Sequence, residues 1–280
     1  MNIESLKAKL LNISREEGID LQELLNRFGS EQFLARLSAS PYADRMVFKG
    51  GTLLTYILET ERRTRDLDFS VMGIGNTLED VLSLIDRILK IRLDDGIDWA
   101  RPTGVSLDHP EMDYPGYRIK CPFMLCKSKG LVRMDFATGD VVKARKMHIE
   151  RIRYKDEPLV GADFDILVYP LESIFSEKLH IAIKRAGANT RMKDYYDMYK
   201  LVLSEELDES LLKSSISDTF KKRETEIKTA IAFDAATMDL LQGYWAPFIR
   251  KTKIEDAPGN LKDVITVINT MLGNIYGRKR

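Results

Sequence analysis

The sequence predicts an α+β protein: a mixed β-sheet domain with flanking helices over residues 1–165, followed by an all-helical domain over residues 166–280. Two observations lead to this prediction. In the first part of the chain, helical segments are separated by short runs that alternate apolar and polar residues and end at Pro or Gly, which is typical of strands. After Tyr169-Pro170 the apolar residues recur at helical spacing as far as about residue 275.

The individual elements follow from the same two periods. The N-terminal helical pattern is interrupted near Gly29-Ser30, where Ser30 suits an N-cap, so two or three helices are expected there. The expected helices of the first domain are 3–13, 20–38, 53–60 and 77–93, and its expected strands are 46–48, 67–71, 116–121 and 131–136. The expected helices of the second domain are 171–183, 190–204, 207–219, 221–232, 234–249 and 259–275.

Composition limits the partners and the compartment. Lys and Arg together number 43, as do Asp and Glu, so the formal net charge is zero and a polyanion would need a local basic surface. Cys121 and Cys126 are the only cysteines, and we expect reduced thiols rather than a zinc site. The sequence has no signal-peptide core and no apolar run of membrane-spanning length, so we expect a cytoplasmic protein without a membrane partner.

Asp66 and Asp68 are the first candidates for chemistry. They alternate with Leu67 and Phe69, so on a strand both carboxylates point to one face while the apolar side chains enter a core. Two adjacent carboxylates repel each other unless a cation lies between them, and Mg²⁺ prefers oxygen ligands together with substrate phosphates. The pattern therefore predicts a site for Mg²⁺ (or Mn²⁺).

A phosphate-binding turn is expected at Gly50, Gly51 and Thr52, which ends fourteen residues before Asp66. Paired glycines let a backbone approach a ligand closely, and the helix N-terminus that follows them favours phosphate. Together with the acidic pair, this turn indicates that the protein handles a nucleotide. No Gly-x-Ser-x-Gly, P-loop or dinucleotide fingerprint is present, which removes those hydrolase, kinase and dehydrogenase classes.

Asp135 is expected to be the third metal ligand. It lies in the alternating run 132–136, where burying an unpaired charge would be costly. Asp140 is the rival third carboxylate, although it follows Thr138-Gly139 as a turn residue would. An ion pair of Asp135 with Arg133 or another base is the alternative role.

These motifs, in this order, resemble the AbiEii/AbiGii family, toxin-type nucleotidyltransferases of the DNA polymerase β-like superfamily. The resemblance covers about half of the chain and rests on Gly50-Gly51-Thr52, Arg63 to Phe69, Asp135, Glu177-Lys178, and Arg191, Lys193, Asp194 and Asp197. It implies a nucleotidyltransferase-type sheet domain and a helical domain that completes the nucleotide cleft.

The resemblance also implies a biological role. Such a protein is a toxin of a toxin–antitoxin or abortive-infection system in phage defence, with a cognate antitoxin that acts at the protein or gene level. Some relatives add nucleotides to the 3′ end of tRNA. The implied reaction is the Mg-dependent transfer of NMP from an NTP substrate to an acceptor hydroxyl, at the 3′ end of a tRNA, with release of pyrophosphate.

The resemblance assigns further residues to the nucleotide. Thr64 and Arg65 stand next to the acidic pair, where the Thr64 hydroxyl would face the triphosphate. Lys178 matches a lysine that binds the triphosphate, and it shares a helix face with apolar residues, so it should point inward. Asp194 matches an acidic residue that acts as a base or orients the attacking hydroxyl, and Arg191 lies within one turn of it. A snorkelling Lys178 and a self-paired Arg191–Asp194 helix surface are the alternatives.

Two basic tracts are candidates for RNA contact. One begins with Lys143, Arg145 and Lys146 and continues to Lys155, and Arg62 to Arg65 form the other. The first tract is alternatively an exposed β-ribbon with alternating charge. For the whole protein, the alternatives are a small-molecule (antibiotic-type) nucleotidyltransferase and a non-catalytic NTP-binding interaction module.

Overall fold

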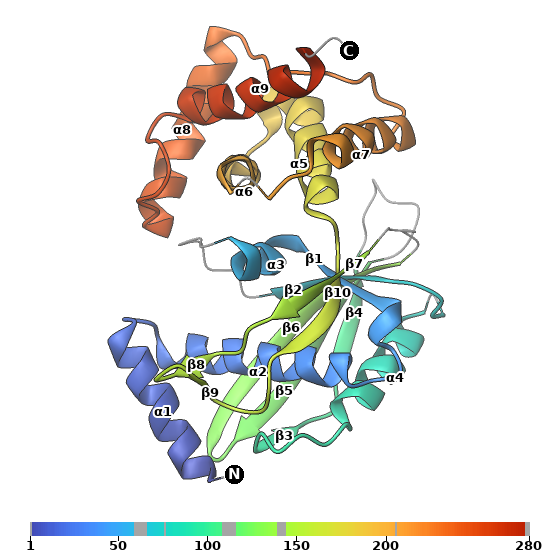
Figure 1. The fold of residues 1–280 in the computed structure, drawn as a ribbon, viewed down its shortest axis with the longest axis vertical. Coiled ribbons are helices and arrows are strands. Elements are labelled where there is room, and N and C mark those ends of the chain that lie inside the picture. The colour runs from blue at the N-terminus through green and yellow to red at the C-terminus, as the bar shows by residue number, and fades with distance from the viewer. Residues whose placement is uncertain are drawn as a thin grey trace. The chain divides into compact units, whose positions relative to one another are not determined.

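The structure is a computed structural model that describes residues 2–58, 66–75, 77–107, 116–138, 144–204 and 206–277. The chain forms two compact units, whose elements are labelled in Figure 1. The first unit comprises Met1–Tyr56 and Thr64–Tyr169, and the second comprises Ile57–Arg63 and Pro170–Arg280.

A mixed sheet forms the centre of the first unit. The strands are β1 (Met46–Lys49), β2 (Asp66–Val71), β3 (Ile97–Trp99), β4 (Thr103–Leu107), β5 (Gly116–Leu125), β6 (Ser128–Thr138), β7 (Arg145–Ile149), β8 (Arg153–Tyr154), β9 (Glu157–Pro158) and β10 (Phe164–Val168). In the described residues the main sheet has eight strands in the order β3-β5-β6-β2-β1-β10-β7, with β4 also paired to β5. β2 runs parallel to β6 and β1 parallel to β10, whereas β8 and β9 form a separate ribbon.

Helix α2 covers one face of this sheet. The described helices of the first unit are α1 (Ile3–Glu16), α2 (Leu21–Ser38), the 3₁₀ helix η1 (Ala43–Arg45), α3 (Gly50–Ile57) and α4 (Leu78–Leu89). Figure 1 shows α2 running across the strands. The Phe33 ring of α2 meets the Phe69 ring of β2 edge-on at 5.9 Å, and Phe69 stacks on Phe136 of β6 at 5.5 Å between ring centroids. These aromatic contacts define the buried face.

The expected break in this helix is wrong. α2 is continuous from Leu21 to Ser38, and its N-cap is Asp20, whose side chain accepts from the Glu23 amide, so Ser30 is a buried mid-helix residue. Gly29 is present for packing, because a Cβ at this position would overlap the ring of Phe123 on β5. The glycine therefore marks a close helix–sheet approach rather than a helix end.

The opposite side of β2, β5 and β6 carries polar residues. We call this the open face and define it by Asp66, Asp68, Arg118, Lys120, Arg133 and Asp135, all of which are partly or fully exposed. The residues that alternate with them, such as Leu67, Ile119 and Met134, are 0% exposed. Alternation along the strands thus separates an apolar buried face from a charged one.

The second unit is helical throughout its regular elements. In the described residues these are α5 (Leu171–Arg185), η2 (Ala186–Ala188), α6 (Met192–Leu203), α7 (Glu209–Lys222), α8 (Ala235–Thr252) and α9 (Leu261–Gly277). The helix expected at 221–232 is wrong, because α7 ends at Lys222 and Ile231 is the only buried residue between Arg223 and Asp234. Because only Ile231 is buried there, the apolar residues of this segment do not form a packed helix face. The Asn269 side chain instead binds the amide and the carbonyl of Ile231.

Two further findings concern the whole described chain. Both cysteines are free thiols, as expected, with Cys121 buried and Cys126 exposed. Among the helices of the described residues, none has the length and apolar character needed to cross a lipid bilayer.

Candidate active site

Asp66 and Asp68 begin strand β2 and share its open face. The residues between and after them, Leu67 and Phe69, are fully buried, whereas both aspartates are partly exposed. The strand alternation predicted from the sequence is therefore confirmed for this segment. Two carboxylates at i and i+2 of one strand stand close enough for their charges to interact.

The Gly50–Thr52 turn is bound tightly to this acidic pair. Gly50 begins α3 with a φ of 78°, a left-handed backbone that favours glycine, and a Cβ there would overlap the Asp68 carboxylate. The Thr52 hydroxyl donates to the Asp66 carbonyl oxygen at 2.6 Å. Glycine is required at position 50 for both conformation and space, and Thr52 fixes the start of α3 to the start of β2.

Asp135 stands beside Asp68 on the neighbouring strand. In the parallel register of β2 and β6, Asp68 lies directly opposite Asp135, so the two side chains share the open face. On the other side of β6, Asp135 lies opposite Arg118 of β5. The structure therefore brings the three predicted carboxylates onto one face.

Arg118 holds Asp135 in a two-point ion pair. Its Nε donates to Asp135 Oδ1 at 2.8 Å and its Nη2 donates to Oδ2 at 2.7 Å. The hydrogen bonds and charge of Asp135 raise the pKa of Arg118, and the charges of Asp66 and Asp68 raise it further. An ion pair of Asp135 with a base other than Arg133, which the sequence left open, is thus present.

The donor chemistry of this face can be tested against a divalent cation. Asp66 and Asp68 offer carboxylate oxygens on one surface, which suits an ion such as Mg²⁺ that completes its shell with water and phosphate. Both oxygens of Asp135 accept from Arg118. Among the described residues, no three Asp, Glu, His or Cys side chains are grouped as a metal site. The residues fit a cation held by two carboxylates, with Asp135 engaged elsewhere.

A second charged cluster lies within the helical unit. The Lys178 ammonium on α5 is 2.7 Å from Asp194 Oδ1 and 2.8 Å from Asp197 Oδ2, both on α6. Asp194 also accepts from Arg191 Nε at 2.7 Å. The side chains of Lys178, Asp194 and Asp197 are 12%, 0% and 4% exposed, so this cluster is almost completely shielded from water. Lys178 points inward as predicted, and its anionic partners are these two aspartates.

Mutual attraction overcomes burial in this cluster. Burial by itself would lower the pKa of Lys178, but the charges of Asp197 and Asp194 raise it above its ordinary value. Burial would likewise raise the pKa of Asp194, but the charges of Lys178 and Arg191 lower it. The pairing therefore favours the charged forms of Lys178 and Asp194. The self-paired Arg191–Asp194 contact, which the sequence left open, is also present.

Two residues of these clusters were not among the sequence candidates. Asp197 belongs to the quoted motif and follows Asp194 by three positions on the same helix face, so helical spacing was a signal for it. Arg118 lies in a strand that the sequence predicts. Its contact with Asp135, however, depends on the register between β5 and β6. No local pattern specifies that register.

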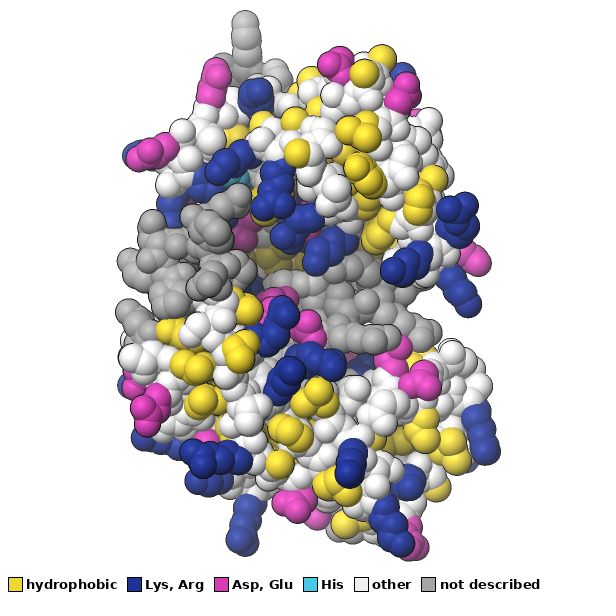
Figure 2. Space-filling view, turned by 180° about the vertical axis from the view of Figure 1, so that it is seen from behind, with side chains coloured by type: hydrophobic (Ala, Val, Ile, Leu, Met, Phe, Trp, Pro, Cys, Tyr) yellow, Lys and Arg dark blue, Asp and Glu magenta, His cyan; other side chains and the backbone are white. Residues whose placement is uncertain are grey.

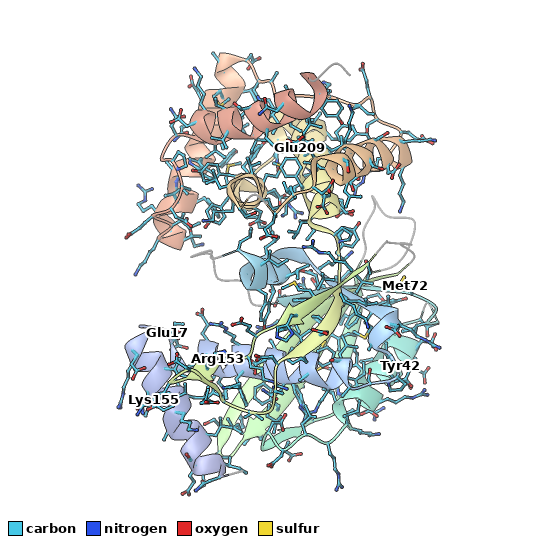
Figure 3. All side chains as sticks on the ribbon, in the orientation of Figure 1. Glu17, Tyr42, Met72, Arg153, Lys155 and Glu209 are labelled. Atoms are coloured by element: carbon cyan, nitrogen blue, oxygen red, sulfur yellow. The ribbon has the colours of Figure 1, made fainter. Side chains whose placement is uncertain are left out.

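The basic tract after β6 is divided in the structure. Arg145 and Lys146 are exposed on β7, at one end of the strand order. Arg151 is buried and donates to the Ala162 carbonyl and the Gln32 side chain. Figure 3 shows Arg153 and Lys155 on the β8–β9 ribbon beside α1, and Arg153 also pairs with Asp163 at 2.6 Å. The tract is therefore not one continuous basic surface.

Several predicted site residues lie outside the described residues. These are Thr64 and Arg65 of the nucleotide site, Arg62 and Arg63 beside them, Asp140 as the rival carboxylate, and Lys143 of the RNA tract.

A mixed sheet with an acidic strand next to a glycine turn is the arrangement expected from the sequence for a nucleotidyltransferase-type domain. The fold is similar to a crystal structure of an H. pylori protein named as a candidate nucleotidyltransferase, with a TM-score of 0.52 and 16% identity over 93% of this chain and 97% of that one. Residues 32–267 match the family described as "Nucleotidyl transferase AbiEii toxin, Type IV TA system". The chain therefore belongs to the AbiEii family. A search among curated proteins gave no match.

Proposed function

We propose that this chain transfers a nucleoside monophosphate from an NTP to a hydroxyl at the 3′ end of tRNA. Membership of the AbiEii family makes it a toxin-type nucleotidyltransferase, and the donor, the metal and the acceptor are added by the proposal. One observation supports the chemistry above all: Asp66 and Asp68 share a partly exposed face with the Asp68 carboxylate packed against Gly50. This arrangement places carboxylates next to a helix N-terminus suited to phosphate.

The acidic pair and the glycine turn would act together on the nucleotide. Asp66 and Asp68 would hold Mg²⁺ (or Mn²⁺), which supplies positive charge against the triphosphate when bound, and Asp135 is the third candidate ligand. The amides of Gly51 and Thr52 at the start of α3 would contact phosphate oxygens. By family resemblance, Thr64 and Arg65 would contact the same triphosphate.

The transfer itself is a substitution at phosphorus. The acceptor oxygen bonds to the α-phosphorus, the bond from that phosphorus to the β-phosphate oxygen breaks, and pyrophosphate leaves while the hydroxyl proton passes to water. Catalysis of this kind depends mainly on positioning and charge neutralisation.

The family resemblance assigns a role in nucleotide binding or transfer to three residues of the helical unit, Lys178, Asp194 and Arg191. Asp194 suits the role of orienting Lys178 better than that of a base. It is 0% exposed, accepts from two cations, and has a lowered pKa, all of which oppose its taking a proton. We therefore propose that Asp194 and Asp197 fix the Lys178 ammonium within the helical unit, and the assignment of Lys178 to the triphosphate rests on the family resemblance alone.

The proposal is tested by labelling RNA. The purified protein is incubated with each α-³²P NTP, Mg²⁺ and total cellular RNA, and the products are separated on a gel. We expect a labelled band of tRNA size with the wild-type chain and at least about 100-fold less label with Asp66→Asn or Asp68→Asn. The matched control is Asp98→Asn, which removes an exposed strand aspartate of β3 in the same sheet and should leave labelling unchanged.

Other outcomes of this experiment contradict the proposal. Label in a small molecule rather than in RNA would indicate an antibiotic-type transferase. NTP binding without pyrophosphate release would indicate a non-catalytic module. Undiminished labelling by both aspartate variants would remove Asp66 and Asp68 from the mechanism.

The toxin role is tested in cells. Because type IV toxin–antitoxin membership implies a cognate antitoxin, we expect wild-type expression alone to arrest growth. Asp68→Asn should grow normally at the same protein level, whereas Asp98→Asn should arrest growth. Arrest by Asp68→Asn would separate toxicity from nucleotidyl transfer.

A further inference from the structure

Two cations of the open face stand side by side. Lys120 on β5 and Arg133 on β6 are directly opposite each other in the antiparallel register. Like charges in directly opposite positions destabilise a sheet. Arg118 nearby is paired with Asp135, but no carboxylate among the described residues forms an ion pair with Lys120 or Arg133. Arg133 therefore stands between Lys120 and Asp66, whereas Lys120 has no carboxylate opposite it on β4 or β6, and an anion would compensate the like-charge pair.

Strand alternation directs the side chains of Lys120 and Arg133 to the open face. Their neighbours Ile119 and Cys121 on β5, and Val132 and Met134 on β6, are all 0% exposed on the opposite face. Lys120 is exposed and Arg133 is partly exposed on the open face. Figure 2 shows a face of the first unit on which Lys and Arg side chains gather beside Asp and Glu side chains.

The register leads from this pair to the acidic residues. One row across the sheet consists of Thr103 on β4, Lys120, Arg133 and Asp66. The adjacent row consists of Val105 on β4, Arg118, Asp135 and Asp68. Because neighbouring strands are about 4.8 Å apart, the backbone of Lys120 lies roughly 10 Å from that of Asp66.

We propose that the open face of β4, β5 and β6 holds the acceptor RNA, with Lys120 and Arg133 on phosphates of nucleotides that precede the reacting 3′ end. The row that contains Lys120 and Arg133 extends from Asp66 to the exposed Thr103 on β4, so it suits an extended chain of phosphates rather than one compact triphosphate. This inference rests on the proposed function and adds the surface that binds the acceptor. It places RNA on this face instead of on Arg145 and Lys146 of β7.

The test measures binding of a fluorescent bulk tRNA pool without NTP, from 50 to 200 mM KCl. We expect the double variant Lys120→Gln/Arg133→Gln to bind at least 10-fold more weakly at 100 mM KCl. Its slope of log Kd against log salt should fall by roughly 1.4, because each contact to a single-stranded phosphate contributes about 0.7.

A matched control removes the same charge from the same hairpin. Lys127 and Lys129 are exposed at its turn, and Lys129 lies four residues before Arg133, roughly 13 Å along β6. Lys127→Gln/Lys129→Gln should leave both the Kd and the slope within error. A second readout excludes misfolding: the Lys120/Arg133 variant should melt no lower than wild type, since it removes a like-charge pair.

The outcomes separate this inference from the proposed function. Equal losses in the two double variants, or a loss confined to Arg145→Gln/Lys146→Gln, would overturn the open face as the RNA surface. So would unchanged tRNA binding with weakened NTP binding, which would assign the cations to the triphosphate. If tRNA is labelled by the wild type while Lys120→Gln/Arg133→Gln binds it normally, the proposed function stands and this inference fails. If tRNA binds through Lys120 and Arg133 but no label is transferred, the RNA-binding surface stands and the proposed function fails.

Discussion

The two charged clusters of this protein use aspartates in opposite ways. In the sheet unit, Asp66 and Asp68 lie partly exposed on one face, next to a third carboxylate that is held by Arg118. In the helical unit, Asp194 and Asp197 enclose the Lys178 ammonium and are almost fully buried. The first arrangement keeps two carboxylates partly exposed to solvent, whereas the second encloses its carboxylates within the fold. Substitutions should therefore affect activity in the first cluster and both stability and activity in the second.

The largest expected effect on stability comes from Lys178→Met. It leaves two buried carboxylates facing each other, so we expect the second unit to lose about 3–5 kcal/mol of unfolding free energy. Urea unfolding followed by Trp245 fluorescence in a Trp99→Phe background measures this unit, because the chain has only these two tryptophans. Lys184→Met, at an exposed position of the same helix, is the control and should change stability by less than about 0.5 kcal/mol. A neutral Lys178→Met would show that the buried cluster is not a stabilising network.

The next largest effect is expected at Gly50. Gly50→Ala should cost at least about 2 kcal/mol, because the new methyl group overlaps the Asp68 carboxylate in addition to straining the backbone. Gly73→Ala isolates the backbone contribution: Gly73 has a similar φ of 64° but no atom within 4 Å of the added Cβ, so about 1 kcal/mol is expected. An equal loss of unfolding free energy in the two variants would show that the Asp68 carboxylate does not pack against Gly50. Urea unfolding followed by Trp99 in a Trp245→Phe background makes the comparison.

A pH series distinguishes the clusters further. Because the pKa of Asp194 is lowered in the fold, its charged form stabilises the second unit above its ordinary pKa of 3.8, and this contribution is lost as the pH falls through the lowered value. The unfolding free energy of this unit should therefore decrease as the pH drops below about 3.8. Asp194→Asn should flatten that decrease, and Asp239→Asn at an exposed position of α8 should not. An unchanged acid slope in Asp194→Asn would contradict the buried pairing.

The smallest predicted effect concerns Arg118. Removing its charge frees Asp135, so Arg118→Gln should raise the affinity for Mn²⁺ by about three- to fivefold, as expected for loss of a partly exposed ion pair. Arg101→Gln, an exposed cation beside β4, should leave the affinity unchanged. Weaker Mn²⁺ binding in Arg118→Gln would mean that Arg118 positions Asp135 for the cation rather than withholding it. Isothermal titration of the two variants decides between these roles.

The parts of the structure that follow a local period were predictable. The i, i+2 alternation at Asp66 and Asp68 gave both the strand and the shared face, and the helical spacing around Lys178 gave its inward direction. Each of these features depends on residues a few positions apart, where backbone geometry fixes the side-chain direction.

Features that depend on distant contacts were not predictable in the same way. From the sequence, Gly29 suggested a helix end. It is glycine because the Phe123 ring, which lies on another element, leaves no room for a Cβ. The Arg118–Asp135 and Lys120–Arg133 pairs require the β5–β6 register, which alternation alone leaves open. The segment after Lys222 contains enough apolar residues to suggest a helix, but it is anchored by Asn269 instead.

The central claim is that the partly exposed acidic pair Asp66 and Asp68 holds a divalent cation, and Mn²⁺ binding tests it most directly. Titration followed by electron paramagnetic resonance needs neither the nucleotide nor the acceptor. The wild type and Asp98→Asn should bind Mn²⁺ with the same affinity, and Asp66→Asn and Asp68→Asn should each bind it at least about 10-fold more weakly. Equal Mn²⁺ affinity in all four proteins would contradict the account.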